Sequence, residues 1–146
     1  KIVDRLAPIA ERAKDEDVYF CLESEGSTNS GTCREIAQII DAVKPNDNMM
    51  VAWDCNNSAR LGEHPLEQGY PAIKDRIRHL HVKPDSHMSI ETVADTAVSY
   101  RTVIETLIDG GYDGIASVEH WGSRWLMLEG VRQTAELLDD IQGNAG

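Results

Sequence analysis

The sequence predicts a parallel α/β fold made of four strand and helix units. Short apolar runs of strand length alternate with amphipathic helical segments, and most of these runs lack polar residues, as is typical of strands covered by helices. Each run closes on a side chain that can bind a metal ion. An open doubly wound sheet and part of a (β/α)8 barrel both fit this alternation. We favour a half-barrel, four βα units of a TIM (β/α)8 barrel, because barrel sites lie at the carboxyl ends of strands and the chain has no G-x-G-x-x-G phosphate loop.

The first half of the chain supplies two of the four units. Residues 2–14 have apolar positions at helical spacing, and we expect a helix that belongs to a preceding unit. Residues 18–23 form the first expected strand, which ends on Glu23. A polar loop then leads into an amphipathic helix over residues 33–43. The second expected strand, residues 49–54, ends on Asp54, and its alternate residues Met49, Val51 and Trp53 should face the helices.

The second half repeats this pattern. Residues 55–65 read as a loop before a short helix that ends at Ile73. The third expected strand, residues 76–83, places His79, His81 and Lys83 on one face because they lie two residues apart. A helix over residues 99–108 ends at a Gly-Gly pair, a short strand then closes on Glu119, and residues 123–141 form the last helix.

Length and charge limit the possible functions. The 146 residues, 41% of them hydrophobic, suffice for a single domain, residues 1–146, and no apolar run approaches the roughly 20 residues of a membrane span. A net charge of −11 opposes binding to nucleic acid. Three cysteines without CxxC spacing argue against a disulfide framework or a zinc finger, and no signal peptide is visible, so we expect a cytoplasmic protein.

Four motifs resemble the C-terminal half of the xylose isomerase-like TIM-barrel superfamily of sugar isomerases and epimerases. They are Phe20-Cys-Leu-Glu23, Val51-Ala-Trp-Asp54, His79-Leu-His-Val-Lys83 and Gly111-Tyr-Asp-Gly-Ile-Ala-Ser-Val-Glu119. Their four candidate ligands are separated by 31, 27 and 38 positions, a spacing similar to that of the family's ketose 3-epimerases. The motifs span nearly the whole chain, so the resemblance implies that the N-terminal half of the barrel is absent.

The resemblance also implies a set of site residues. Glu23, Asp54, His81 and Glu119 would hold one divalent ion, manganese first, with magnesium, cobalt or zinc as alternatives. Glu23 and Glu119 would be the catalytic acid and base. The candidate residues for substrate binding are Asn57, Lys83, His87 and Trp121. His79 would lie beside the ligands and orient them without binding the ion. Asn57 and His87 stand where many members have His and Arg, which affects the choice of substrate more than metal binding.

By the same resemblance the activity would be metal-dependent isomerisation or epimerisation of a ketose or sugar phosphate through an enediolate, in carbohydrate metabolism. Three alternatives stay open at this point. One is an inosose-type dehydratase on the same fold, and another is a non-catalytic sugar-binding barrel fragment. The third is an apurinic endonuclease-like phosphodiesterase, which Asn57 and the acidic charge disfavour.

The predicted half-barrel would have two unpaired edges. Four parallel strands leave backbone donors and acceptors exposed on the first and last strands, and such edges invite association. We therefore expect these edges to pair with the missing N-terminal half-barrel or with a second copy in a homo-oligomer. In either case the isolated piece could bind metal and still be inactive.

Overall fold

The computed structural model describes residues 1–84, 89–94, 96–120 and 122–143, and its centre is one parallel sheet. The strands are β1 (Phe20–Glu23), β2 (Met49–Asp54), β3 (Ile77–Val82) and β4 (Ile115–Val118), in the order β1-β2-β3-β4. All three neighbouring pairs are parallel, and Asp54 of β2 is in register with His81 of β3. This register brings the carboxyl ends of the strands together at one edge of the sheet.

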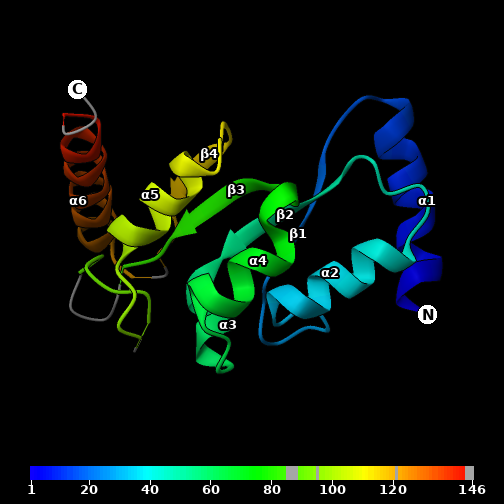
Figure 1. Cartoon of the computed structure of the whole chain (residues 1–146), viewed down its shortest axis with the longest axis horizontal. Coiled ribbons are helices and arrows are strands. Elements are labelled where there is room, and N and C mark those ends of the chain that lie inside the picture. Colours follow the sequence, from blue (N-terminus) through cyan, green and yellow to red (C-terminus); the bar gives the residue numbers. More distant parts are fainter. Residues whose placement is uncertain (85–88, 95, 121, 144–146) are drawn as a thin grey trace.

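Helices precede, connect and follow the strands. They are α1 (Ile2–Asp15), α2 (Cys33–Ala42), α3 (Cys55–Arg60), α4 (Tyr70–Ile73), α5 (Tyr100–Asp109) and α6 (Arg124–Gly143), and a π-helical turn (Pro65–Gly69) and a 3-10 turn (Lys74–Arg76) flank α4. In Figure 1, α1 and α6 lie at opposite ends of the molecule with the sheet between them. Strand and helix therefore alternate as the sequence predicts.

One face of the sheet carries the hydrophobic core. Met49, Val51 and Trp53 of β2 are fully buried and belong to one cluster with apolar residues of α2, α4 and α5. Burial of this kind stabilises a fold by roughly 25 cal/mol per Å² of apolar surface. The opposite face carries Asp54 and the histidines of β3, so the two faces of β2 are divided as the alternation predicts.

The first strand is shorter than predicted. Val18 and Tyr19 precede β1 and are 53% and 56% exposed. The Val18 amide donates to the Ala13 carbonyl at the end of α1 (2.9 Å), and sheet pairing starts only where the Phe20 amide meets the Asn48 carbonyl (2.9 Å). The end of α1 therefore takes up the part of the chain that the apolar pattern assigns to the strand.

A helix replaces part of the loop expected after β2. Residues 55–60 form α3, because the Asp54 side chain accepts a hydrogen bond from the Asn57 amide (3.0 Å) and caps the helix. The prediction of a loop here was wrong for these six residues. The consequence for the site is that Asp54 and Asn57 are held in a fixed relation.

Both outer strands have a free edge within the described sheet, since β1 pairs only with β2 and β4 only with β3. Large apolar side chains are exposed on β4 and at the start of α6: Ile115 is 67% exposed and Trp125 is 75% exposed. Among the described residues, no helix combines the length and apolarity that crossing a bilayer requires.

Candidate metal centre

Four side chains from four strands meet at the carboxyl edge of the sheet. Glu23 and Asp54 end β1 and β2, His81 is the fifth residue of β3, and Glu119 follows β4 directly. The Glu119 amide donates to the Val82 carbonyl (3.0 Å), and this hydrogen bond extends the β3–β4 pairing to Glu119. One ligand atom from each of the four residues lies within 4.8 Å of the other three. We call this group the acid cluster.

His81 links the two glutamates of the acid cluster. Its Nδ1 atom lies 3.0 Å from Glu23 Oε1 and 3.2 Å from Glu119 Oε2, and its side chain is only 16% exposed. Burial raises the pKa of Glu23, a shift that the His81 ring opposes and the neighbouring carboxylates of Glu119 and Asp54 increase. Three acids around one imidazole therefore form a site that a cation would stabilise.

Asp54 is fully buried, and its main chain is fixed by a neighbour. The Ser24 hydroxyl donates to the Asp54 carbonyl (2.8 Å) and accepts from the Asp54 amide (3.2 Å), so one side chain satisfies both main-chain groups. Oδ1 caps α3 through Asn57, which leaves Oδ2 for the acid cluster. Asp54 can therefore cap α3 and serve as a metal ligand at the same time, because a different carboxylate oxygen serves each role.

Lys83 inserts a positive charge among these acids. Its Nζ atom lies 2.6 Å from Asp54 Oδ2, 3.5 Å from Glu119 Oε2 and 3.4 Å from Asn57 Oδ1. Burial acts to lower the pKa of Lys83, but the contacts with Asp54 and Glu119 outweigh it and the net shift is upward. The ammonium is therefore the counter-ion of the acid cluster in this structure.

The donor set fits a divalent ion. Among the described residues, the buried oxygens Asp54 Oδ2 and Glu119 Oε2 meet only ion-pair partners: Lys83 Nζ lies 2.6 Å from the first, and His81 Nδ1 and Lys83 Nζ lie 3.2 Å and 3.5 Å from the second. Buried carboxylate oxygens are costly unless a positive charge or a donor faces them, and a metal ion could take the place of these partners. Three carboxylates and one imidazole suit manganese, magnesium, cobalt or zinc, and the arrangement does not discriminate among these ions.

The remaining predicted residues divide into two groups. Asn57 and His79 lie beside the acid cluster: the Asn57 amide group donates to the Ser24 carbonyl (2.8 Å), and the His79 ring meets that of His81 edge to face with centroids 4.8 Å apart. Burial, and then the His81 ring, lower the pKa of His79. His87 and Trp121 lie outside the described residues, so their role stays a prediction.

Two serines near the acid cluster were missed by the sequence reasoning. Ser24 holds Asp54, and the Ser117 hydroxyl is 2.7 Å from His79 Nε2. Strand alternation contains a signal for Ser117, because it lies two residues before Glu119 and so shares its face. Ser24 has no such signal in the pattern, since it follows the last residue of β1 and acts across the sheet.

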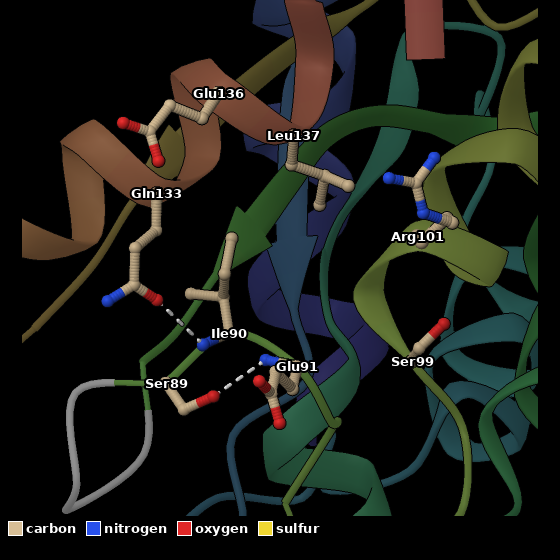
Figure 2. A pocket seen from close by; sticks show the side chains of 8 residues that line it. All are labelled: Ser89, Ile90, Glu91, Ser99, Arg101, Gln133, Glu136 and Leu137. Carbon is tan, nitrogen blue, oxygen red and sulfur yellow. Dashed lines mark hydrogen bonds between the residues drawn. The ribbon is translucent and has the colours of Figure 1, made fainter. Parts of the chain in front are cut away.

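A cavity of about 680 Å³ lies elsewhere, between residues 89–91, the start of α5 and the middle of α6 (Figure 2). Its polar lining includes Arg101 and Gln133, and the Gln133 side chain accepts from the Ile90 amide (3.3 Å). None of the four residues of the acid cluster lines this cavity. We place the candidate site at the acid cluster because it is the group of His, Asp and Glu side chains in the described part of the chain that lie close enough together to share one metal ion.

The comparisons agree with this architecture. The family model described as "Xylose isomerase-like TIM barrel" matches residues 1–141. A D-tagatose 3-epimerase-like protein is similar in structure (TM-score 0.75, 21% identity), with 99% of this chain aligned to 55% of that one. So is the probable 3-DHS dehydratase AsbF of petrobactin synthesis from Bacillus anthracis (TM-score 0.68, 19% identity), with 87% aligned to 52%. Among curated proteins none matches significantly.

These matches confirm the predicted barrel architecture over the doubly wound sheet. The chain spans about half the length of the solved structures that it matches, as four of the eight strands of a (β/α)8 barrel should. At such low sequence identity the likeness shows the fold alone. The chemistry must therefore be argued from the acid cluster itself.

Proposed function

The chain belongs to the xylose isomerase-like TIM-barrel family, and from this premise we propose that it is the metal-binding part of a sugar isomerase or epimerase. The observation that carries the proposal is the acid cluster, with its four ligand atoms mutually within 4.8 Å at the carboxyl edge of the sheet. Barrel enzymes build their sites at this edge. The substrate would be a ketose or a sugar phosphate.

Glu23, Asp54, His81 and Glu119 would hold one divalent ion, with manganese as our first choice. When bound, such an ion supplies Lewis-acid polarisation of a substrate carbonyl and an adjacent hydroxyl. The protein's own contribution is to orient the ligands. Ser24 fixes the main chain of Asp54, and Glu23 and Glu119 both contact the Nδ1 atom of His81. These contacts keep the ligands in place before substrate arrives.

Glu23 and Glu119 are the proposed acid and base. A carboxylate that removes the proton next to the substrate carbonyl generates an enediolate, and return of a proton from the other glutamate gives the isomer or epimer. The raised pKa of Glu23 supports this role, because a carboxyl whose pKa is closer to neutrality exchanges protons more readily at physiological pH. Both carboxylates contact one histidine nitrogen, so they flank a common space.

Solvent exchange tests the proposal directly. Ketoses and ketose phosphates are incubated with the manganese-loaded protein in D₂O, and deuterium at the carbon next to the carbonyl is measured by NMR. We expect incorporation with wild type and none with Glu23→Gln or Glu119→Gln. Metal content by mass spectrometry should be near one ion per chain in wild type and lower in Glu119→Gln. No bound metal and no exchange with any sugar would refute the proposal.

A dehydratase is the second candidate, and Lys83 is the observation that favours it. An ammonium 3.5 Å from Glu119 could donate a proton to a hydroxyl group that leaves after enediolate formation. One of the similar structures is also described as a probable dehydratase. Loss of water from the substrate, seen as a mass decrease of about 18 in the product, would distinguish this reaction from epimerisation, which conserves mass.

Charge and cysteines support a small-molecule enzyme of the cytoplasm. The net charge of −11 disfavours nucleic acid as a substrate. Cys21, Cys33 and Cys55 are free, as is usual in a reducing compartment. A cytoplasmic setting is therefore part of the proposal.

We further propose that another half-barrel completes the site by pairing with the free edges of β1 and β4. The exposed apolar side chain of Ile115 on β4 supports contact with a partner there, and Trp125 at the start of α6 is exposed as well. The partner half could be an N-terminal part of the same protein or a second copy of this chain. Light scattering of this chain alone separates the two: a dimer supports the second copy, and a stable monomer refutes it.

A further inference from the structure

Lys83 occupies the position from which a cation would contact the acid cluster. We propose that Lys83 and the divalent ion compete for Asp54 and Glu119, so that the ammonium leaves these carboxylates when the ion binds and becomes available to the substrate. This inference rests on the proposed function, since it assumes that the acid cluster binds a metal ion. The Lys83 side chain would thus have two positions: against Asp54 and Glu119 when no metal ion is bound, and away from them when one is.

The first step of the argument concerns the two buried oxygens. Asp54 Oδ2 and Glu119 Oε2 are buried, and Lys83 Nζ forms ion pairs with both, at 2.6 Å and 3.5 Å. The ammonium therefore compensates the charge of Asp54 and shares that of Glu119 with the His81 ring, whose Nδ1 lies 3.2 Å from Glu119 Oε2. These carboxylates also belong to the set of ligands that the acid cluster offers to a metal ion.

The second step is that the two cations exclude one another. A doubly charged ion held by Asp54 Oδ2 would lie beside the ammonium, which already contacts this oxygen. Water screens charges poorly in a partly buried site, so the ion and the ammonium would repel one another strongly. Lys83 must therefore withdraw or weaken metal binding.

The third step is that Lys83 can withdraw without disturbing the sheet. Its main chain is anchored on both sides, because its amide donates to the Tyr100 hydroxyl (2.9 Å) and its carbonyl accepts from Asn56 Nδ2 (2.9 Å). The side chain has four rotatable bonds beyond this anchor. Asn57 Oδ1, 3.4 Å from Nζ, provides another acceptor for the ammonium.

Calorimetry with Mn²⁺ alone tests the competition. Chelator-treated wild type, Lys83→Met and Lys74→Met are titrated in the same buffer; Lys74 is exposed and precedes β3, whereas Lys83 follows its other end. We expect Lys83→Met to bind Mn²⁺ about tenfold more tightly than wild type or better, because a competing charge is gone. Lys74→Met should bind as wild type does. Equal or weaker binding by Lys83→Met would overturn the proposal.

A second measurement needs no variant and so remains valid if Lys83→Met does not fold. Wild-type protein is acetylated with a lysine reagent, with and without Mn²⁺, and the labelled peptides are quantified by mass spectrometry. Labelling of Lys83, whose side chain is 12% exposed in this structure, should rise severalfold with Mn²⁺ while labelling of Lys74 stays constant. Unchanged or reduced labelling of Lys83 would contradict its release.

The outcomes separate this inference from the function on which it rests. Wild type that binds no Mn²⁺ refutes the metal site and the competition together. Wild type that binds Mn²⁺ with unchanged affinity in Lys83→Met leaves the metal site intact and refutes the competition alone.

Discussion

Ser24 provides a sharp test of how the acid cluster is held together. Its hydroxyl donates to the carbonyl of Asp54 (2.8 Å) and accepts from its amide (3.2 Å), and both residues are fully buried. The substitution Ser24→Ala removes both hydrogen bonds and adds no new group.

The expected cost follows from burial. A lost hydrogen bond costs about 1 kcal/mol net, and a buried main-chain group left without a partner costs about 1 to 3 kcal/mol. For two such groups we expect Ser24→Ala to lower the free energy of unfolding by about 2 to 3 kcal/mol, since part of the loss can be recovered by a bound water. The loosened Asp54 should also weaken Mn²⁺ binding by about tenfold.

Urea denaturation followed by far-UV circular dichroism measures the first effect, and calorimetry with Mn²⁺ the second. Ser27→Ala is the matched control, because Ser27 lies in the same loop and its hydroxyl contacts Glu25 at an exposed position (3.2 Å). It should lose less than about 0.5 kcal/mol and bind Mn²⁺ normally. If the two variants lose the same stability, Ser24 does not hold Asp54.

Three further predictions concern helix capping, metal linkage and pH. Glu63→Gln should lower the free energy of unfolding by about 2 kcal/mol in urea titrations. The buried Glu63 carboxylate accepts hydrogen bonds from the Cys33 and Arg34 amides at the start of α2 (2.8 and 3.2 Å). An effect no larger than that of Glu35→Gln, at an exposed position, would contradict this prediction. Mn²⁺ at about a hundred times its Kd should stabilise the chain by about 2.7 kcal/mol in thermal melts, a gain that chelator removes. Calorimetry from pH 7 to pH 5 should show weaker Mn²⁺ binding at the lower pH. The ligands must lose their protons, and burial raises the pKa of Glu23, so that Glu23 takes up its proton at a higher pH than an exposed glutamate. Binding that is independent of pH would contradict this prediction.

The sequence is sufficient to predict those parts of the fold that depend on local pattern. The bounds of β2 agree with the strand predicted over residues 49–54, a short apolar run that ends on Asp54 and is followed by a turn pattern. Contacts between distant segments account for the errors. Val18 leaves the predicted strand because its amide bonds to the end of α1, and α3 forms because the Asp54 side chain caps it.

The candidate site follows the same division. Strand alternation places Glu23, Asp54, His81 and Glu119 at corresponding strand ends, so their convergence could be predicted, and the structure brings them together. The sequence does not contain the position of the Lys83 ammonium, which depends on the register of three strands and on side-chain rotamers. That Glu23, Asp54, His81 and Glu119 bind a metal ion is the proposal that the Mn²⁺ measurements test.

Because each member of the acid cluster comes from a different strand, the cluster depends on the alignment of the whole sheet. A slip of one residue in any strand would turn its ligand toward the helix-covered face. The absorption spectrum of a Co²⁺ derivative would then report whether all four strands had aligned correctly. Such a colour signal could be used to sort refolding conditions or redesigned variants of this chain, with no knowledge of its substrate.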